Sequence, residues 1–391
     1  MGLRGREPRL KRTRLPVLAS VAAGSVVALA LLLGWGSNSD RVERTFVPYV
    51  GPAVSLVPQS VAALAPFSVA EWVCALTLGG AVAFVARTVR LGWLTPEEFG
   101  AIVRRAAAWT VLAGSWIAIW FYASWGLAYG RSPLEARLGW STGETEEIDL
   151  PLADLERLAA DLVERVNRLY LELHGWPDAF TVTASPNGLD AVDQSVDAGW
   201  ERAAYVLGLD VEALRSRGPA KRLLLSPAFS VLGLGGFYFP FTGEANVNDG
   251  PPEWQLAHTI AHEKAHQRFF APENEANFMG FVACVSSPDL FVRYAGWLFA
   301  QRQALRTLAR RDPQAFQDLV TDRLPGVQRD VDASRAFWAR YEGPISELSD
   351  QVNDAYLRAN AVEGGVQSYS RSFELYVRWV RAGRPGALPE P

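Results

Sequence analysis

One stretch of the chain carries residue types and a spacing that suit metal chemistry. Residues 254–270 read WQLAHTIAHEKAHQRFF and contain the pattern H-E-x-x-H, formed by His262, Glu263 and His266. Residues four apart on an α-helix share one face, so the two imidazoles can reach a single ion. This arrangement is typical of a zinc site whose glutamate serves as general base. We therefore predict that a helix over 253–270 binds Zn²⁺ and that Glu263 takes a proton from zinc-bound water.

The chain has only four histidines, so a chance pair at this spacing is rare. The alternative interpretation is two surface histidines beside a solvated glutamate. His258 continues the same row one turn earlier. Because a catalytic zinc usually takes three protein ligands, we expect His258 to support the ligands and not to bind the metal.

The third ligand is expected just after the motif, where Pro272 can start a new helix. On that helix Glu273 shares a face with Asn277 and with the small residue Gly280, which allows close approach to the first helix. Glu273 is the predicted ligand, and Glu275 is the alternative. Asn277 is expected to hydrogen-bond a ligating histidine. The competing interpretation is that both glutamates only favour a helix N-terminus, where negative charge is stabilising.

Two further features are candidates for contacts with a substrate. Residues 237–248 read FYFPFTGEANVN, and we predict an edge strand that pairs with a substrate backbone, formed by Glu244, Ala245, Asn246, Val247 and Asn248. An ordinary edge strand is the alternative. Tyr369 and Arg371 are the nominees for donating a hydrogen bond to the negative charge that develops during hydrolysis.

The N-terminal part contains three apolar stretches long enough to cross a bilayer, at about residues 15–35, 69–86 and 107–128. The first follows six basic residues, and no A-x-A-like cleavage site comes after it, so a retained anchor is favoured over a signal peptide. Residues 278–300 are also apolar. They are interrupted at Pro288 and contain Arg293, which favours two packed helices over a fourth span.

Flanking charge predicts the orientation. The N-terminal tail and the loop with Arg87, Arg90, Arg104 and Arg105 are basic, so both are expected in the cytoplasm. With three spans, everything after about residue 130 lies outside the cytoplasmic membrane. We expect a membrane region over 1–142 and an extracytoplasmic metallopeptidase domain over 143–391.

Composition narrows the class of protein. The chain of 391 residues has a net charge of −4, which gives no general attraction to nucleic acid. Its two cysteines, Cys74 and Cys284, are too few for a disulfide framework. Helical periodicity dominates from residue 150 onward, with β-branched and glycine-rich residues over 223–248. The expected fold is therefore α+β and helix-rich, with three transmembrane helices followed by a zincin-like domain.

The chain resembles a bacterial family of three-span membrane proteins of unknown function that carry an H-E-x-x-H domain. The segments that carry the resemblance are 125–134 (WGLAYGRSPL), 238–248 (YFPFTGEANVN), 262–278, 353–360 (NDAYLRAN) and 365–369 (GVQSY). The motif is also similar to that of the gluzincin peptidases, where E-x-x-x-D supplies a ligand and its supporting carboxylate. Glu273 and Asn277 match that pattern with Asn in place of Asp. Lys264 and Phe269 stand where an apolar residue and a glycine are expected.

These observations favour a membrane-anchored zinc metallopeptidase that hydrolyses a polypeptide or a cell-wall peptide. The first alternative is a zinc-binding membrane receptor or scaffold without catalysis, which would not need Glu263. The second is an intramembrane protease, for which residues 253–270 are too polar. The expected partners are the substrate and the lipid bilayer, without nucleic acid.

Overall fold

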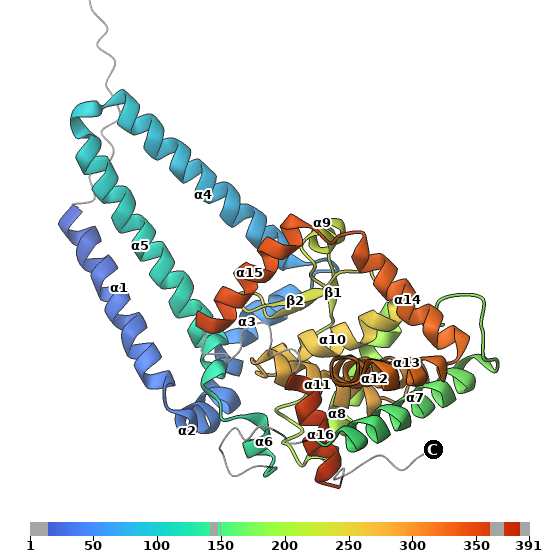
Figure 1. Ribbon diagram of the computed structural model, residues 1–391. Helices are drawn as coiled ribbons and strands as arrows, with labels where there is room; N and C mark the ends of the chain where they lie inside the picture. Colours follow the sequence, from blue (N-terminus) through green and yellow to red (C-terminus); the bar gives the residue numbers. More distant parts are fainter. Residues whose placement is uncertain (1–14, 141–147, 149, 360–370, 384–391) are drawn as a thin grey trace, which may run out of the picture.

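A computed structural model describes residues 15–140, 148, 150–359 and 371–383 (Figure 1). Helices dominate these residues, and their one sheet has three short strands, so the expected helix-rich α+β composition is confirmed. The helices of the N-terminal part are α1 (Leu15–Gly36), α2 (Ser39–Arg41), η1 (Val42–Val50), α3 (Gly51–Ala63), α4 (Val69–Leu94), η2 (Pro96–Glu98), α5 (Phe99–Ser124), η3 (Gly126–Gly130) and α6 (Leu134–Arg137). Those that follow are α7 (Leu152–His174), α8 (Leu189–Leu207), α9 (Ser226–Val231), α10 (Glu253–Gln267), α11 (Glu273–Val285), α12 (Leu290–Arg311), α13 (Pro313–Thr321), α14 (Pro325–Ala339), α15 (Pro344–Ala359) and α16 (Ser372–Arg381).

Within the described residues, three helices are long and apolar enough to span a membrane, as expected: α1, α4 and α5 with its preceding turn. Their apolar side chains face outward along most of their length, which suits lipid as the surrounding solvent. The second and third of these helices differ in extent from the expectation. The second helix continues to Leu94, and the third runs over 99–124 and stops where Trp125 leaves helical geometry at φ −157°.

The connection between the first and second spans lies on the same side as the C-terminal domain. In Figure 1 the α4–α5 turn is at the far end of the helices, whereas α2 and α3 lie against the domain. Two spans, α4 and α5, separate that connection from the domain, so the chain after α5 returns to the same side. The side of the membrane on which the domain lies remains a prediction.

The domain core is built around α10 and α11. Gly280 of α11 approaches α10 so closely that a Cβ atom there would lie 3.0 Å from the main-chain nitrogen of His262. On its other side α11 meets α8, where a Cβ atom at Gly199 would lie 2.1 Å from the Ala283 oxygen. Helix α12 packs on the same core, and the break at Pro288 separates it from α11. Residues 278–300 are therefore two packed helices and not a span.

The sheet has the order β1-β3-β2, formed by β1 (Lys221–Arg222), β3 (Glu244–Val247) and β2 (Gly236–Phe239). β3 is parallel to β1 and antiparallel to β2. The prediction of an edge strand over 244–248 is therefore wrong, because β3 is the middle strand and all four of its residues are buried. The edge beside α10 belongs to β2. Strand order depends on pairing between distant segments, which local sequence does not encode.

The N-terminal part and the domain share contacts. Leu134 belongs to the main hydrophobic core together with residues of α10 and α11. The Glu244 carboxylate accepts the main-chain N–H groups of Val69 and Ala70, at 3.0 and 2.8 Å, and so caps the N-terminus of α4. The predicted boundary at 142/143 falls in 141–147, outside the described residues. Residues before that boundary are part of the domain's packing.

Candidate metal centre

The H-E-x-x-H residues lie on α10, and Glu273 is the first residue of α11. Pro272 precedes α11 in extended geometry, which turns the chain back so that Glu273 faces α10. One nitrogen from each of His262 and His266 and one carboxylate oxygen of Glu263 lie within 4.8 Å of one another. The sequence-predicted helix and its close neighbour are thus both present.

Potential ligand atoms from three residues converge at this point. The Nε2 atoms of His262 and His266 are 3.2 Å apart. The Glu273 carboxylate oxygens lie 3.2 Å from His262 Nε2 and 3.7 Å from His266 Nε2. Ligand atoms about 2.0–2.1 Å from a tetrahedral zinc ion are roughly 3.4 Å from one another. The donor set and its spacing therefore fit Zn²⁺.

The charges of these groups support one another. Burial alone would lower the pKa of His266, but the Glu273 carboxylate raises it to about 8. Burial alone would raise the pKa of Glu273, but His266 and His262 hold it well below its usual range. The Glu273 carboxylate is therefore ionised at neutral pH, and a carboxylate beside two imidazoles is a suitable ligand set for a divalent cation.

A main-chain carbonyl orients His266. Its Nδ1 lies 2.8 Å from the Phe270 oxygen, so Nδ1–H donates there and leaves Nε2 free to act as a ligand. The carbonyl is placed by the turn that ends α10, in which Phe270 N bonds Ala265 O and Phe269 N bonds His266 O. Phe269 adopts φ 64°, the only positive φ at a non-glycine among the described residues. A glycine was expected here, and the backbone conformation explains why.

Glu263 lies beside the outer edge of β2, an edge strand of the sheet. It is buried, and its carboxylate accepts the main-chain N–H of Tyr238 on β2. Burial raises the pKa of Glu263 to about 7, against the lowering influence of the two histidines. A Cβ atom at Gly236 would lie 2.8 Å from Glu263 Oε1, so β2 passes very close to this carboxylate. The arrangement places a group able to exchange protons beside both histidines.

Glu275, the alternative ligand, is used elsewhere. Its carboxylate accepts the Leu134 N–H at 2.9 Å and pairs with Arg137. It therefore ties α11 to α6, and of the two carboxylates only Glu273 faces the histidines.

Asn277 and His258 contact each other. His258 Nε2 lies 3.2 Å from the Asn277 main-chain oxygen, and its ring stacks on Phe299 with centroids 3.6 Å apart. Burial, followed by the neighbouring His262, lowers the pKa of His258 to about 3. His258 is thus a neutral packing residue beside the site. The carbonyl that supports a motif histidine comes from Phe270, where Asn277 had been expected to act.

The remaining sequence candidates lie apart or serve the fold. Glu244 caps α4, and Asn248 Nδ2 bonds the Ser230 hydroxyl and the Leu234 carbonyl inside the domain. Tyr369 lies outside the described residues. Arg371 directly precedes α16, whose first residue, Ser372, is 3.5 Å from Gln303 of α12. A role for Arg371 in catalysis remains a prediction.

Trp125 was missed as a contributor to the site. In the sequence it falls within the third apolar stretch, at about 107–128. In the structure its indole N–H donates to the His266 oxygen at 2.7 Å. Nothing local in the sequence signals this contact, because 141 positions separate the two residues.

A buried charge cluster behind α10 was also missed. Lys264 has no exposed surface and donates to Asp193 and Asp197 of α8, each at 2.7 Å. Arg268 bonds Asp197 at 3.0 Å, and its guanidinium lies over the Trp200 ring. The available signal was the pair of aspartates four apart on α8, which share one helix face.

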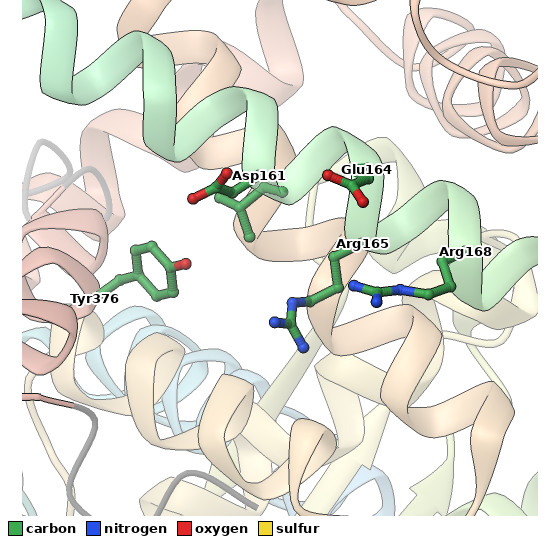
Figure 2. A pocket seen from close by; sticks show the side chains of 6 residues that line it. Asp161, Glu164, Arg165, Arg168 and Tyr376 are labelled. Carbon is green, nitrogen blue, oxygen red and sulfur yellow. The ribbon is translucent and has the colours of Figure 1, made fainter. Parts of the chain in front are cut away.

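A separate hollow of about 180 Å³ lies between α7 and α16 and contains none of these residues. Figure 2 shows its lining, which consists of Asp161, Leu162, Glu164, Arg165, Arg168 and Tyr376. Each acid stands four residues before an arginine on α7, the usual spacing of ion pairs on a helix surface.

Comparison with known proteins places the chain in a family and gives no further match. The fold defines a helix-rich protein whose three apolar helices could anchor it in a membrane. The profile of the family described as "Protein of unknown function (DUF3810)" matches residues 46–377, so the chain belongs to that family. No curated protein and no solved structure matches the chain.

Proposed function

We propose that this protein is a membrane-anchored zinc metallopeptidase. The observation that carries the proposal is the convergence of His262, His266 and Glu273, whose ligand atoms lie 3.2–3.7 Å apart. The buried Glu263 beside them is the second support, because a site that only stabilises the fold has no use for such a base.

The proposed roles follow from the contacts. His262 and His266, each through Nε2, and the Glu273 carboxylate hold the ion, and the Phe270 carbonyl fixes the His266 ring. Bound zinc supplies a Lewis acid and lowers the pKa of a water molecule. Glu263 accepts a proton at its carboxylate and passes it to the departing amine. Because burial brings its pKa near neutrality, it can both accept and release that proton.

The substrate strand moves from β3 to β2 in this proposal. The Asn248 N–H donates to the Gly235 carbonyl, so antiparallel alternation directs the main-chain groups of Phe237 and Phe239 to β3 and those of Gly236 and Tyr238 to the outer edge. Tyr238 already donates its N–H to Glu263 there. An extended polypeptide, or the peptide of a cell wall, added along this edge would bring a scissile bond beside Glu263.

The test is the metal content and hydrolytic activity of the full chain in detergent micelles. Wild type should contain one zinc per chain, His262→Ala and Glu273→Gln should lose it, and Glu263→Gln should keep it without activity. Glu275→Gln is the matched control on the same helix, because it should keep zinc and lose stability. Activity is measured as new N-termini released from a mixture of denatured polypeptides.

A folded wild type without zinc would overturn the proposal. Zinc bound by the predicted ligands, with no cleavage in wild type, would instead favour a zinc-binding receptor or scaffold. The full chain is needed because Trp125 and Arg137, which precede the predicted domain, contact α10 and α11.

A further inference from the structure

Helix α15 exposes its apolar side chains and turns polar ones toward the protein. Ile345, Leu348 and Val352 are 56, 59 and 63% exposed, although their spacing places them on one face. The face toward the protein carries Ser346, Ser349, Asn353 and the buried Leu357. A third face is exposed and polar, formed by Glu347, Asp350, Gln351 and Arg358. An ordinary surface helix would bury the first of these faces.

Helix α3 has the same reversed arrangement. Its buried face consists of Gly51, Ser55 and Ala62, and Gln59 beside them donates to the Gly243 oxygen at 3.3 Å. Its exposed side chains are apolar apart from Ser60, and the largest of them are Leu56, Val57 and Val61, followed by Leu64 at the helix end. Neither helix can be explained by burial inside the domain.

Both helices lie where the spanning helices meet the domain. α3 ends shortly before α4 begins. A Cβ atom at Gly233, just after α9, would be 3.7 Å from the Ser346 side chain of α15. At the start of α9, the N–H groups of Leu224 and Leu225 donate to the Glu71 carboxylate in the first turn of α4. In Figure 1, α15 runs across the direction of α4 and α5, between their domain-side ends.

We propose that α3 and α15 are in-plane helices that bind the lipid bilayer at the surface where α4 and α5 leave it. Each large apolar side chain that moves from water into lipid favours binding, because its apolar surface leaves water. A helix such as α15, with one apolar and one charged face, suits the headgroup layer, and α3 presents an apolar face to the same surface. The surface is continuous with the spanning helices, which selects lipid over a partner protein as the occupant.

This surface has a consequence for the metal centre. A Cβ atom at Gly51 of α3 would lie 2.8 Å from the Phe269 ring at the end of α10. The end of α10, which carries the proposed metal ligands, therefore packs against α3, and α3 lies on the membrane in this proposal. The inference does not depend on zinc or on catalysis.

The test is spin-label accessibility in the full-length protein, reconstituted in phosphatidylcholine vesicles. The background is Cys74→Ala, which leaves Cys284 fully buried. Labels are attached to Leu348→Cys and Val352→Cys on α15 and to Leu56→Cys and Val61→Cys on α3. Glu347→Cys on the charged face of α15 is the control.

We expect the four apolar positions to collide several times more often with oxygen than with a water-soluble nickel chelate, and Glu347→Cys to show the reverse. Chelate-rich collisions at the apolar positions of either helix would overturn the proposal. Low accessibility to both reagents would overturn it as well, because protein would then cover the face. Zinc content, measured on the same samples, reports separately on the proposed function.

Discussion

The indole of Trp125 donates a 2.7 Å hydrogen bond to the main-chain carbonyl of His266, and the two rings meet edge to face with centroids 5.8 Å apart. Trp125 is the first residue after α5, so the end of an apolar helix contacts α10 directly. The same indole packs on Tyr238, whose N–H donates to Glu263. The Trp125 side chain thus contacts both the proposed ligand His266 and the strand residue beside Glu263.

Trp125→Phe should weaken zinc binding while it preserves the fold. The substitution keeps an aromatic ring and removes the N–H group, a loss of about 1 kcal/mol for a hydrogen bond of this kind. Zinc affinity, measured by competition with a chelator, should fall roughly fivefold if this energy is used to hold His266 in place. Trp116→Phe is the control, since Trp116 lies in mid-α5 with an exposed side chain. Equal affinities in the two variants would mean that Trp125 only packs.

Local patterns explain which features the sequence could predict. The two motif histidines, Glu273 and the close approach at Gly280 all depend on helical periodicity, which residues near in sequence determine. The apolar helices were predicted from continuous apolar stretches, which are also a local property of the sequence. Their ends were placed less accurately, because the stop at Trp125 comes from contacts with the domain.

The missed features depend on distant contacts. β3 lies between β1 and β2 although its sequence suits an edge equally well. An apolar residue was expected at Lys264. The two aspartates of α8 that satisfy its charge precede it by about 70 residues, so the sequence around Lys264 does not show that a buried charge has partners. Phe269 occupies a position that glycine prefers, and tertiary packing stabilises it there.

Asp197→Asn should destabilise the protein markedly. Asp197 contacts both buried cations, Lys264 at 2.7 Å and Arg268 at 3.0 Å. Removal of one charge from a buried cluster leaves the others uncompensated, which typically costs about 3 kcal/mol. The measurement is chemical unfolding in detergent at neutral pH. Asp154→Asn is the control, because its pair with Arg157 is exposed and should contribute little.

The effect of Asp197→Asn should also depend on pH. Burial would raise the pKa of Asp197, but Lys264 and Arg268 hold it below the usual value. A lowered pKa in the folded state gives stabilisation that is present above about pH 3.9, the value in the unfolded chain, and disappears as the pH falls further. The difference between wild type and variant should therefore be complete at neutral pH and shrink in acid. A difference that grows in acid would contradict the assignment.

Phe269→Ala should destabilise more than Phe269→Gly, the reverse of the order at most buried positions. Both variants lose the contact with Phe46, whose ring centroid is 5.7 Å away, and the loss for alanine is about 4 kcal/mol. At φ 64° alanine retains a conformational strain of about 1 kcal/mol that glycine avoids. The comparison requires only relative unfolding midpoints. A more stable alanine variant would show that the turn relaxes to a negative φ.

Gly236→Ala should separate catalysis from metal binding. The new Cβ atom would lie 2.7 Å from the Asn246 oxygen and 2.8 Å from Glu263 Oε1, so either β2 or the glutamate must move. A displacement of about 1 Å at a catalytic group can reduce the rate about a hundredfold. Zinc content should be unchanged, because the three atoms nearest to the new Cβ belong to Asn246 and Glu263, and neither residue is a proposed ligand. Gly235→Ala is the matched control, since its Cβ would meet only the Thr259 side chain at 3.8 Å. Equal cleavage by the two variants would argue against Glu263 as the base and against β2 as the substrate edge, whereas a selective loss in Gly236→Ala would support both.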